Sequence, residues 1–228
     1  MTPLETEALL LSLRVAGWSV LLDLPLGLAA AWVLARSRFP GKFLFDGIVH
    51  LPLIVPPVVV GYLLLVGLGR NGWIGAWLYD VFGLTLTFSW RGAAVASAVM
   101  SFPLMVRAIR LSIEAVDRRL EEAARTLGAS PAWVFLTVTL PLIVPGLITG
   151  TILAFARSLG EFGATITFVS NIPGETRTLP LALYTLVQTP DGEAAAARIV
   201  VISVALALGA LVLSEYLARK SRTAEEAE

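Results

Sequence analysis

Charged residues are scarce in this chain. They make up 15% of its 228 residues, and the formal net charge is zero because 17 Lys and Arg residues balance 17 Asp and Glu residues. Soluble domains usually contain about 25% charged residues. A neutral chain also lacks the basic excess with which proteins bind phosphate backbones. The composition therefore argues against a soluble domain and against a nucleic-acid partner.

Residues for metal or nucleotide binding are scarce as well. The chain has no cysteine, which excludes disulfide bonds and thiolate metal ligands. Its single histidine, His50, argues against a zinc site built from protein side chains. No segment has the P-loop pattern, so the chain cannot bind and hydrolyse ATP by that route. We expect no metal, no cofactor and no catalytic residues, and any ATP must be handled by a separate subunit.

The chain consists largely of long apolar blocks. Hydrophobic residues make up 57% of it, and no charged residue occurs from Thr126 to Ala156. The mean hydropathy is +0.80. A helix of about 20 apolar residues spans the ~30 Å hydrocarbon core of a bilayer, and the alternating short segments of a transmembrane barrel are absent. The sequence predicts an all-α membrane protein, one polytopic bundle with five transmembrane helices at about 9–34, 43–68, 92–113, 134–156 and 195–217.

Basic residues indicate how the chain is oriented in a cell membrane. Cytoplasmic segments are enriched in Lys and Arg. Eleven of the 17 basic residues fall on one side of the five-span arrangement: Arg36, Arg38, Lys42, Arg107, Arg110, Arg118, Arg119, Arg125, Arg219, Lys220 and Arg222. This bias predicts an outside N-terminus and a cytoplasmic C-terminus. Residues 1–17 lack the basic region and cleavage site of a signal peptide, so we expect the first span to be retained.

Two segments lie outside the predicted spans, 117–133 on the inner side and 157–194 on the outer side. The outer segment is broken by Pro and Gly, and we expect short helices or re-entrant structure there. In the inner segment Asp117 is a suitable N-cap, and Gly128 stands where a helix commonly ends in a left-handed residue. Ser130 and Pro131 can open a second helix. The pattern predicts a helix, a tight turn and a helix that enters the membrane.

The first helix of this inner segment is amphipathic. Leu120, Ala123, Ala124 and Leu127 recur at i, i+3, i+4 and i+7, which places them on one face. Charged residues, including Glu121, occupy the remaining surface. Such a helix can lie on the inner leaflet or dock on a soluble partner, and periodicity alone does not decide between them.

A motif in this segment adds to that interpretation. Glu122-Ala123-Ala124, Gly128 four positions after the second alanine, and the ending Val138-Thr139-Leu140-Pro141 resemble the EAA loop of ABC importer permeases. The resemblance implies a type I ABC importer permease fold in which the segment is a coupling helix that inserts into a cytoplasmic ATPase subunit. The residues to which it gives this role are Glu122, Ala123, Ala124, Leu127, Gly128, Leu140 and Pro141.

A second resemblance narrows the family. Residues 153–189 resemble the outer segment of the permeases of molybdate importers, and the resemblance extends over essentially the whole chain. It implies import of molybdate, with tungstate as a near-isosteric companion. It also implies two copies of the chain, two ABC ATPase subunits and an extracytoplasmic binding protein. Sulfate and thiosulfate permeases share a related segment but fit less well through residues 171–190, so they are the alternative.

The outer segment contains candidates for a gate or for a contact with the binding protein: Gly160, Glu161, Phe162 and Gly163. The glycines permit a bend or close packing. A carboxylate would repel a dianion, so we expect Glu161 to be paired away from the path, with Arg157 four residues earlier as a local partner. Gly146 and Gly150 form a GxxxG pair that predicts close helix contact.

Two other classes of function were weighed against an importer subunit. An ion-coupled secondary transporter often has inverted repeats and ionisable residues at the bilayer midplane. Here the number of spans is odd, no repeat is visible and Asp23 is the only plausible midspan acid. A membrane scaffold without transport would not need the coupling motif.

Overall fold

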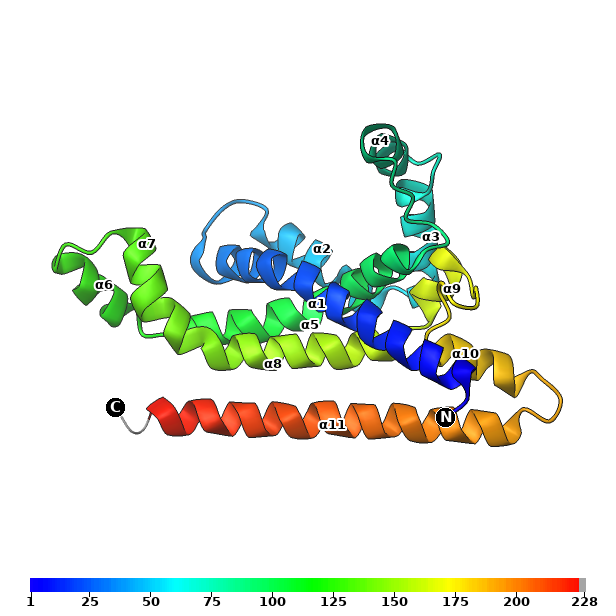
Figure 1. Cartoon of the computed structure of the whole chain (residues 1–228). Coiled ribbons are helices and arrows are strands. Elements are labelled where there is room, and N and C mark those ends of the chain that lie inside the picture. Colours follow the sequence, from blue (N-terminus) through cyan, green and yellow to red (C-terminus); the bar gives the residue numbers. More distant parts are fainter. Residues whose placement is uncertain (226–228) are drawn as a thin grey trace.

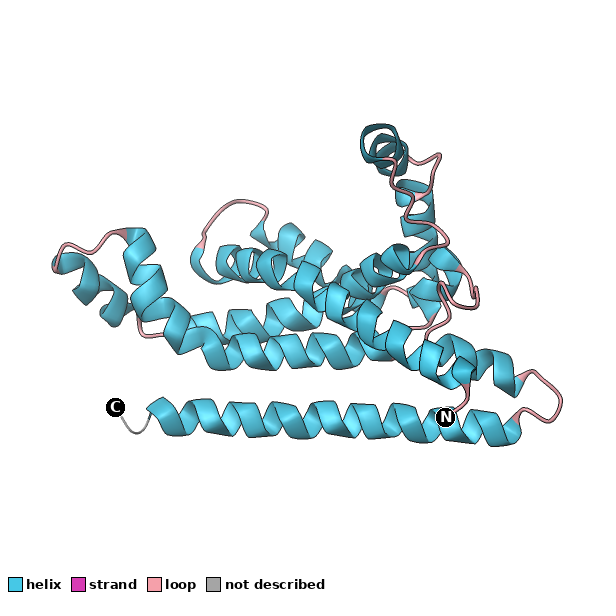
Figure 2. Cartoon of the chain, in the orientation of Figure 1, coloured by secondary structure: helices cyan, strands magenta, loops and turns pink. Residues whose placement is uncertain are grey.

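The computed structural model describes the backbone of residues 1–225, and the side chains of these residues apart from 214, 215 and 217–225. Arg219, Lys220 and Arg222 thus have side chains outside the described part. The helices, labelled in Figure 1, are α1 (Pro3–Arg36), α2 (Lys42–Ile54), α3 (Pro57–Leu68), α4 (Trp73–Phe82), α5 (Trp90–Ala115), α6 (Arg118–Thr126), α7 (Pro131–Val134), the π-helix η1 (Phe135–Thr139), α8 (Leu140–Leu159), α9 (Gly163–Val169), α10 (Leu179–Val187) and α11 (Glu193–Glu225). Among residues 1–225 no strand occurs (Figure 2), which confirms the predicted all-α class.

Four helical stretches are long and apolar enough to cross a membrane: α1, α5, the continuous helix Pro131–Leu159, and α11 over Glu193–Leu213. A fifth crossing requires α2 and α3 to act as one span, and these two helices meet at 115°. The sequence predicted one helix over 43–68. It breaks because Pro56 and Pro57 have no backbone N–H, and because a residue before proline favours extended backbone. Val55 accordingly ends α2 with φ −74° and ψ 137°.

The long helices run between two ends of the molecule, and several short helices lie at these ends. In Figure 1, α6, α7 and the C-terminal part of α11 lie at one end, and the N-terminus, α9 and α10 lie at the other. The helices α1, α5 and α11 run toward the α6 end, whereas α8 runs away from it. The outer segment of the sequence thus forms the short helices α9 and α10 at the end that holds the N-terminus.

The core is a three-helix unit in which α5 packs against both α1 and α8. Its buried apolar residues include Leu34 from α1, Met105 and Ile109 from α5, and Ile143 from α8. Small residues let the backbones approach closely. A Cβ atom on Gly150 would lie 3.2 Å from the carbonyl oxygen of Met105, and one on Gly146 would collide with Ser112. The close contact predicted from the GxxxG pair is therefore confirmed.

The last helix, α11, packs against α8 and α10. Ile199 packs in a buried cluster with Ala8 of α1 and with Leu179 and Ala182 of α10. Nearby, Arg198 Nε donates to Glu5 Oε1 at 2.7 Å, although these residues are 193 positions apart. Farther along α11 large apolar side chains such as those of Val201, Leu208 and Leu211 are exposed. This surface suits lipid or another protein chain.

Candidate functional site

Local capping defines the inner helix–turn–helix. The side chain of Asp117 accepts a hydrogen bond from the backbone N–H of Arg119 at 2.9 Å and caps α6. Gly128 has φ +88°, the left-handed conformation that favours glycine. The Ser130 hydroxyl accepts from the N–H of Trp133 at 3.3 Å and caps α7. The predicted caps and turn are therefore present as the sequence indicated.

The apolar face of α6 is open. Leu127 is 90% exposed, Leu120 and Ala123 are exposed, and Ala124 is half-buried. Trp133 of α7, which follows shortly after them in the sequence, is exposed as well. Apolar side chains uncovered at the end of a membrane bundle mark a surface that another molecule covers. Glu122 is exposed too, so five of the seven motif residues (Glu122, Ala123, Ala124, Leu127 and Gly128) belong to one accessible segment.

Glu121 differs from the expectation that it lies on the solvated face. It is 8% exposed. Its Oε1 atom accepts from Arg36 Nη2 at 2.7 Å and from Thr139 Oγ1 at 2.8 Å. These bonds join α6 to the end of α1 and to the start of the α8 span. Glu121 therefore anchors α6 to the core, whereas its neighbour Glu122 is exposed and has no hydrogen bond or salt bridge to the residues whose side chains are described.

Sequence reasoning missed this anchor because its partners are distant in the chain. Arg36 lies 85 residues before Glu121, and Thr139 lies 18 residues after it. One signal was present. Consecutive residues of a helix point about 100° apart, so Glu121 and Glu122 cannot both face the same partner.

The span that follows α7 begins with a π-helical turn. The N–H of Leu140 bonds to the carbonyl of Phe135, five residues earlier. Pro141 lies directly beyond, where proline lacks a donor and crowds the preceding turn, so a wider turn accommodates it. Leu140 packs against the main core and Pro141 is exposed on the span. The structure thus places these two motif residues away from the open face of α6.

At the outer end, residues 160–163 join α8 to α9. Glu161 is buried, and its Oε2 atom lies 2.6 Å from Arg157 Nη1, which confirms the expected pair. Its Oε1 atom accepts from the N–H of Ala164 at 2.8 Å and so caps α9. A Cβ atom on Gly163 would lie 2.7 Å from Pro57 Cβ. This linker therefore holds α9 directly against the break between α2 and α3.

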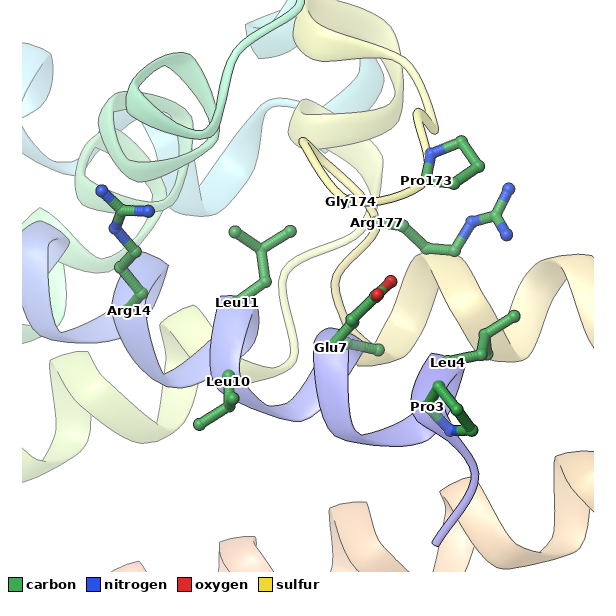
Figure 3. A pocket seen from close by; sticks show the side chains of 10 residues that line it. Pro3, Leu4, Glu7, Leu10, Leu11, Arg14, Pro173, Gly174 and Arg177 are labelled. Atoms are coloured by element: carbon green, nitrogen blue, oxygen red, sulfur yellow. The ribbon is translucent and has the colours of Figure 1, made fainter.

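A groove opens beside the N-terminal part of α1. It has a volume of about 480 Å³ and is lined by α1 and the loop before α10. Figure 3 shows Glu7 and Arg14 on α1, with Pro173, Gly174 and Arg177 across from them. Arg14 lies 3.6 Å from the ring centroid of Trp90 and is held by a cation–π contact. The end that holds the N-terminus thus presents a groove with two cations and one acid on its rim.

A polar cluster is buried between the three central helices. Ser101 Oγ of α5 donates to Asp23 Oδ2 of α1 at 2.7 Å. Ser158 of α8 donates to Ser101 at 3.2 Å and shares a 2.7 Å hydrogen bond with Ser19. The carboxylate of Asp23, the plausible midspan acid of the sequence, therefore joins α1, α5 and α8 through hydroxyl groups.

The comparison with known proteins decides the family. Residues 23–223 match the model of the binding-protein-dependent transport system inner membrane component. The chain belongs to this family. It is therefore a multi-pass membrane component of a transport system, and the ion-coupled secondary transporter and the scaffold are set aside.

Several known transport permeases are similar to this chain over most of their length. The molybdenum transport system permease protein ModB of Escherichia coli (strain K12) is 66% identical over 222 residues, 97% of each chain. The protein of the same name from Haemophilus influenzae is 58% identical over 217 residues, 95% of each chain. The sulfate transport system permease protein CysW of Synechocystis is 40% identical over 215 residues, which are 94% of this chain and 77% of that protein.

Solved structures agree on the fold of this family member. A chain in the crystal structure of a bacterial ABC transporter involved in the import of alginate superposes with a TM-score of 0.76 at 18% identity, covering 96% of this chain and 80% of that one. A chain of the MetNI methionine ABC transporter superposes with a TM-score of 0.74 at 16% identity, covering 97% and 99%. The fold is thus the type I ABC importer permease fold.

Proposed function

We propose that this permease is the membrane-spanning subunit of an ATP-driven importer of molybdate, with tungstate as a near-isosteric companion substrate. The observation that carries the proposal is the 66% identity over 97% of both chains with a molybdenum permease. The sulfate permease CysW is 40% identical and extends beyond the matched region. Sulfate import is therefore the runner-up.

ATP hydrolysis belongs to two separate ABC ATPase subunits on the inner side. The open face of α6 in each copy of the chain would enter one ATPase subunit. Ala123 and Ala124 would allow close approach there, and Leu127 would supply apolar area. Glu122 adds a charge or a hydrogen bond at the rim. The anchor from Glu121 to Arg36 and Thr139 supports this role, because it connects α6 to two membrane helices at once.

A second copy of the chain completes the pathway. Large apolar side chains are exposed along α2 and α3, among them Phe43, Ile54, Val58 and Tyr62. These side chains lie on both arms of the α2–α3 pair, which is bent by 115°. A homodimer with these surfaces turned toward one another would enclose a path.

The outer end receives the substrate from an extracytoplasmic binding protein. The groove between Glu7, Arg14 and Arg177 offers polar contacts for such a protein. The linker Gly160–Glu161–Phe162–Gly163 serves as an outer gate, which is supported by the packing of Gly163 on the α2–α3 break. Because Glu161 is buried and paired, Gly160 and Phe162 are the members that would meet a partner or substrate.

Growth and uptake of a strain that lacks this permease test the substrate. Molybdenum-enzyme activity should be lost at trace molybdate and restored at high molybdate, which enters through other routes. Sulfate uptake should remain normal. A strain with normal uptake of trace molybdate and defective uptake of sulfate would contradict the proposal and favour the runner-up.

A further inference from the structure

The inner half of α5 has one open strip. Leu104, Arg107, Ala108 and Leu111 recur at i, i+3, i+4 and i+7 and are exposed or half-buried, whereas most other residues of this helix are buried. One groove beside the strip is lined by α5 and α8, and another by α5 and α2. The strip therefore lies between α2 and α8, on a side of α5 that α1 does not cover.

Arg107 stands alone in this strip. Arg110, one turn farther along, has its Nε atom 2.8 Å from Glu114 and its Nη1 atom 3.2 Å from Asp46. Arg107 makes no salt bridge or hydrogen bond in the described part of the chain. It lies eight residues before the end of α5 at Ala115, which is about 12 Å along a helix. Arg107 thus lies within the candidate span Trp90–Ala115, in the part nearer α6, without a protein partner among the described residues.

Energetics restrict what such an arginine can face. A charged side chain at the centre of a bilayer costs about 2.5–3.5 kcal/mol, so intramembrane arginines face a bundle interior or a water-filled path. Arg107 also lines both grooves of the strip. The α5–α8 groove, of about 460 Å³, contains the hydroxyl groups of Ser112 and Thr149. The α5–α2 groove, of about 300 Å³, contains Asp46 and Glu114 nearer the inner end.

We propose that Arg107 is the inner anion-binding residue of the translocation path and that it holds a tetrahedral oxyanion dianion as the anion passes from the α5–α8 groove toward the cytoplasm. The inference rests on the proposed importer function. A guanidinium presents several N–H donors in a planar fork that suits an oxyanion. Two copies of the chain supply two positive charges, which match the two negative charges of the dianion. A solvated site of this kind binds weakly, and weak binding lets the anion leave.

Cysteine accessibility tests the site directly, because the natural chain has no cysteine. Leu104→Cys and Leu111→Cys are expressed with the ATPase subunits and treated, in inverted membrane vesicles, with an anionic and a cationic methanethiosulfonate reagent. Both positions should react, and the ratio of the anionic to the cationic rate should exceed the ratio for a free thiol in solution, where the cationic reagent is intrinsically the faster one. Adding Arg107→Gln should lower the anionic-to-cationic rate ratio by about tenfold, whereas Arg107→Lys should largely preserve it. Arg38→Gln, which removes an exposed charge from the α1–α2 loop, should not change it.

Competition identifies the ligand. Millimolar molybdate should slow the anionic reagent in the chain with Arg107 and not in the Arg107→Gln variant. Protection by sulfate and not by molybdate would keep the anion site and overturn the proposed substrate. Cysteines inert to both reagents would place the strip against lipid or the second copy and overturn the site. An unchanged rate ratio in Arg107→Gln would also overturn it, whatever the outcome of the uptake measurements.

Discussion

At the scale of single residues, Glu121 and Glu122 divide two tasks between them. Glu121 is buried and bonded to Arg36 and Thr139, so it holds α6 on the core. Glu122 is exposed and has no such bond in the described part of the chain. Two neighbouring, chemically identical side chains thus differ in surroundings: Glu121 attaches α6 to the membrane helices, and Glu122 is exposed, as a contact with a partner requires.

Substitution of these two glutamates should give opposite profiles. Glu121→Ala removes one partner of a largely buried ion pair, a change that costs about 3 kcal/mol or more, and should lower the melting temperature of the permease in nanodiscs by several degrees. Glu122→Ala should leave that temperature unchanged and reduce the amount of ATPase that co-purifies. Equal melting temperatures for both variants and the natural chain would contradict the anchor.

At the scale of elements, the turn between α6 and α7 depends on one backbone conformation. A Cβ atom on Gly128 would meet no atom within 4 Å, so a substitution there is opposed by the left-handed backbone alone. That conformation costs L-residues about 1–2 kcal/mol, and β-branched residues suffer most. Asparagine tolerates it better.

We therefore expect Gly128→Val to disturb docking without disturbing insertion. Uptake and substrate-stimulated ATP hydrolysis should fall together, while membrane insertion and dimer formation stay near normal. Gly128→Asn should retain most activity. Ala124→Trp should weaken docking by bulk, and Arg119→Ala, at an exposed position, should not. Full uptake and full ATPase association in both Gly128→Val and Ala124→Trp would mean that α6 is an ordinary interfacial helix.

Much of this element pattern follows from local sequence. Apolar runs, the N-caps Asp117 and Ser130, and the left-handed Gly128 are properties of neighbouring residues, and they could be predicted. So could the Arg157–Glu161 pair, which spans one helical turn. The 115° angle between α2 and α3 could not, since the prolines mark a break but the packing of α9 on α3 sets the direction.

The candidate sites were predictable to different degrees. The exposed residues of α6 follow from a helical period and a motif. The bond from Arg36 to Glu121 joins residues 85 positions apart and the bond from Ser101 to Asp23 joins residues 78 apart, which no local pattern brings together. Arg107 is unremarkable in the sequence, where it is one of several arginines near the end of a span. It becomes distinct only once Arg110 is seen to be paired.

At the scale of the whole molecule, the two ends differ in composition. The segments predicted to be cytoplasmic carry 11 of the 17 basic residues, and α6 and α7 lie at the end opposite the N-terminus (Figure 1). This arrangement supports a permease with its N-terminus outside and its C-terminus in the cytoplasm, and with an odd number of crossings that includes the bent pair α2–α3.

Labelling from the two sides of the membrane tests this orientation. Thr6→Cys should react with an impermeant thiol reagent added outside intact cells, because Thr6 is exposed near the N-terminus. Ser221→Cys should react only after the cells are opened. The cysteine-free natural chain is the unlabelled control. Reaction of both cysteines in intact cells would exclude five crossings.

The π-helical turn at Phe135–Thr139 sets how α7 and α6 are rotated about the helix axis relative to α8. Each residue of an α-helix turns the chain by about 100°, and a π turn accommodates one residue more than an α turn. Relative to an uninterrupted α-helix, α7 and the turn that carries α6 are therefore rotated about the axis of α8 by the angle of one extra residue, about 100°. Loss of a single residue in this turn would leave an unbroken helix and turn the open apolar face of α6 to another side of the bundle. The direction in which α6 faces thus depends on the number of residues in this turn, to a single residue.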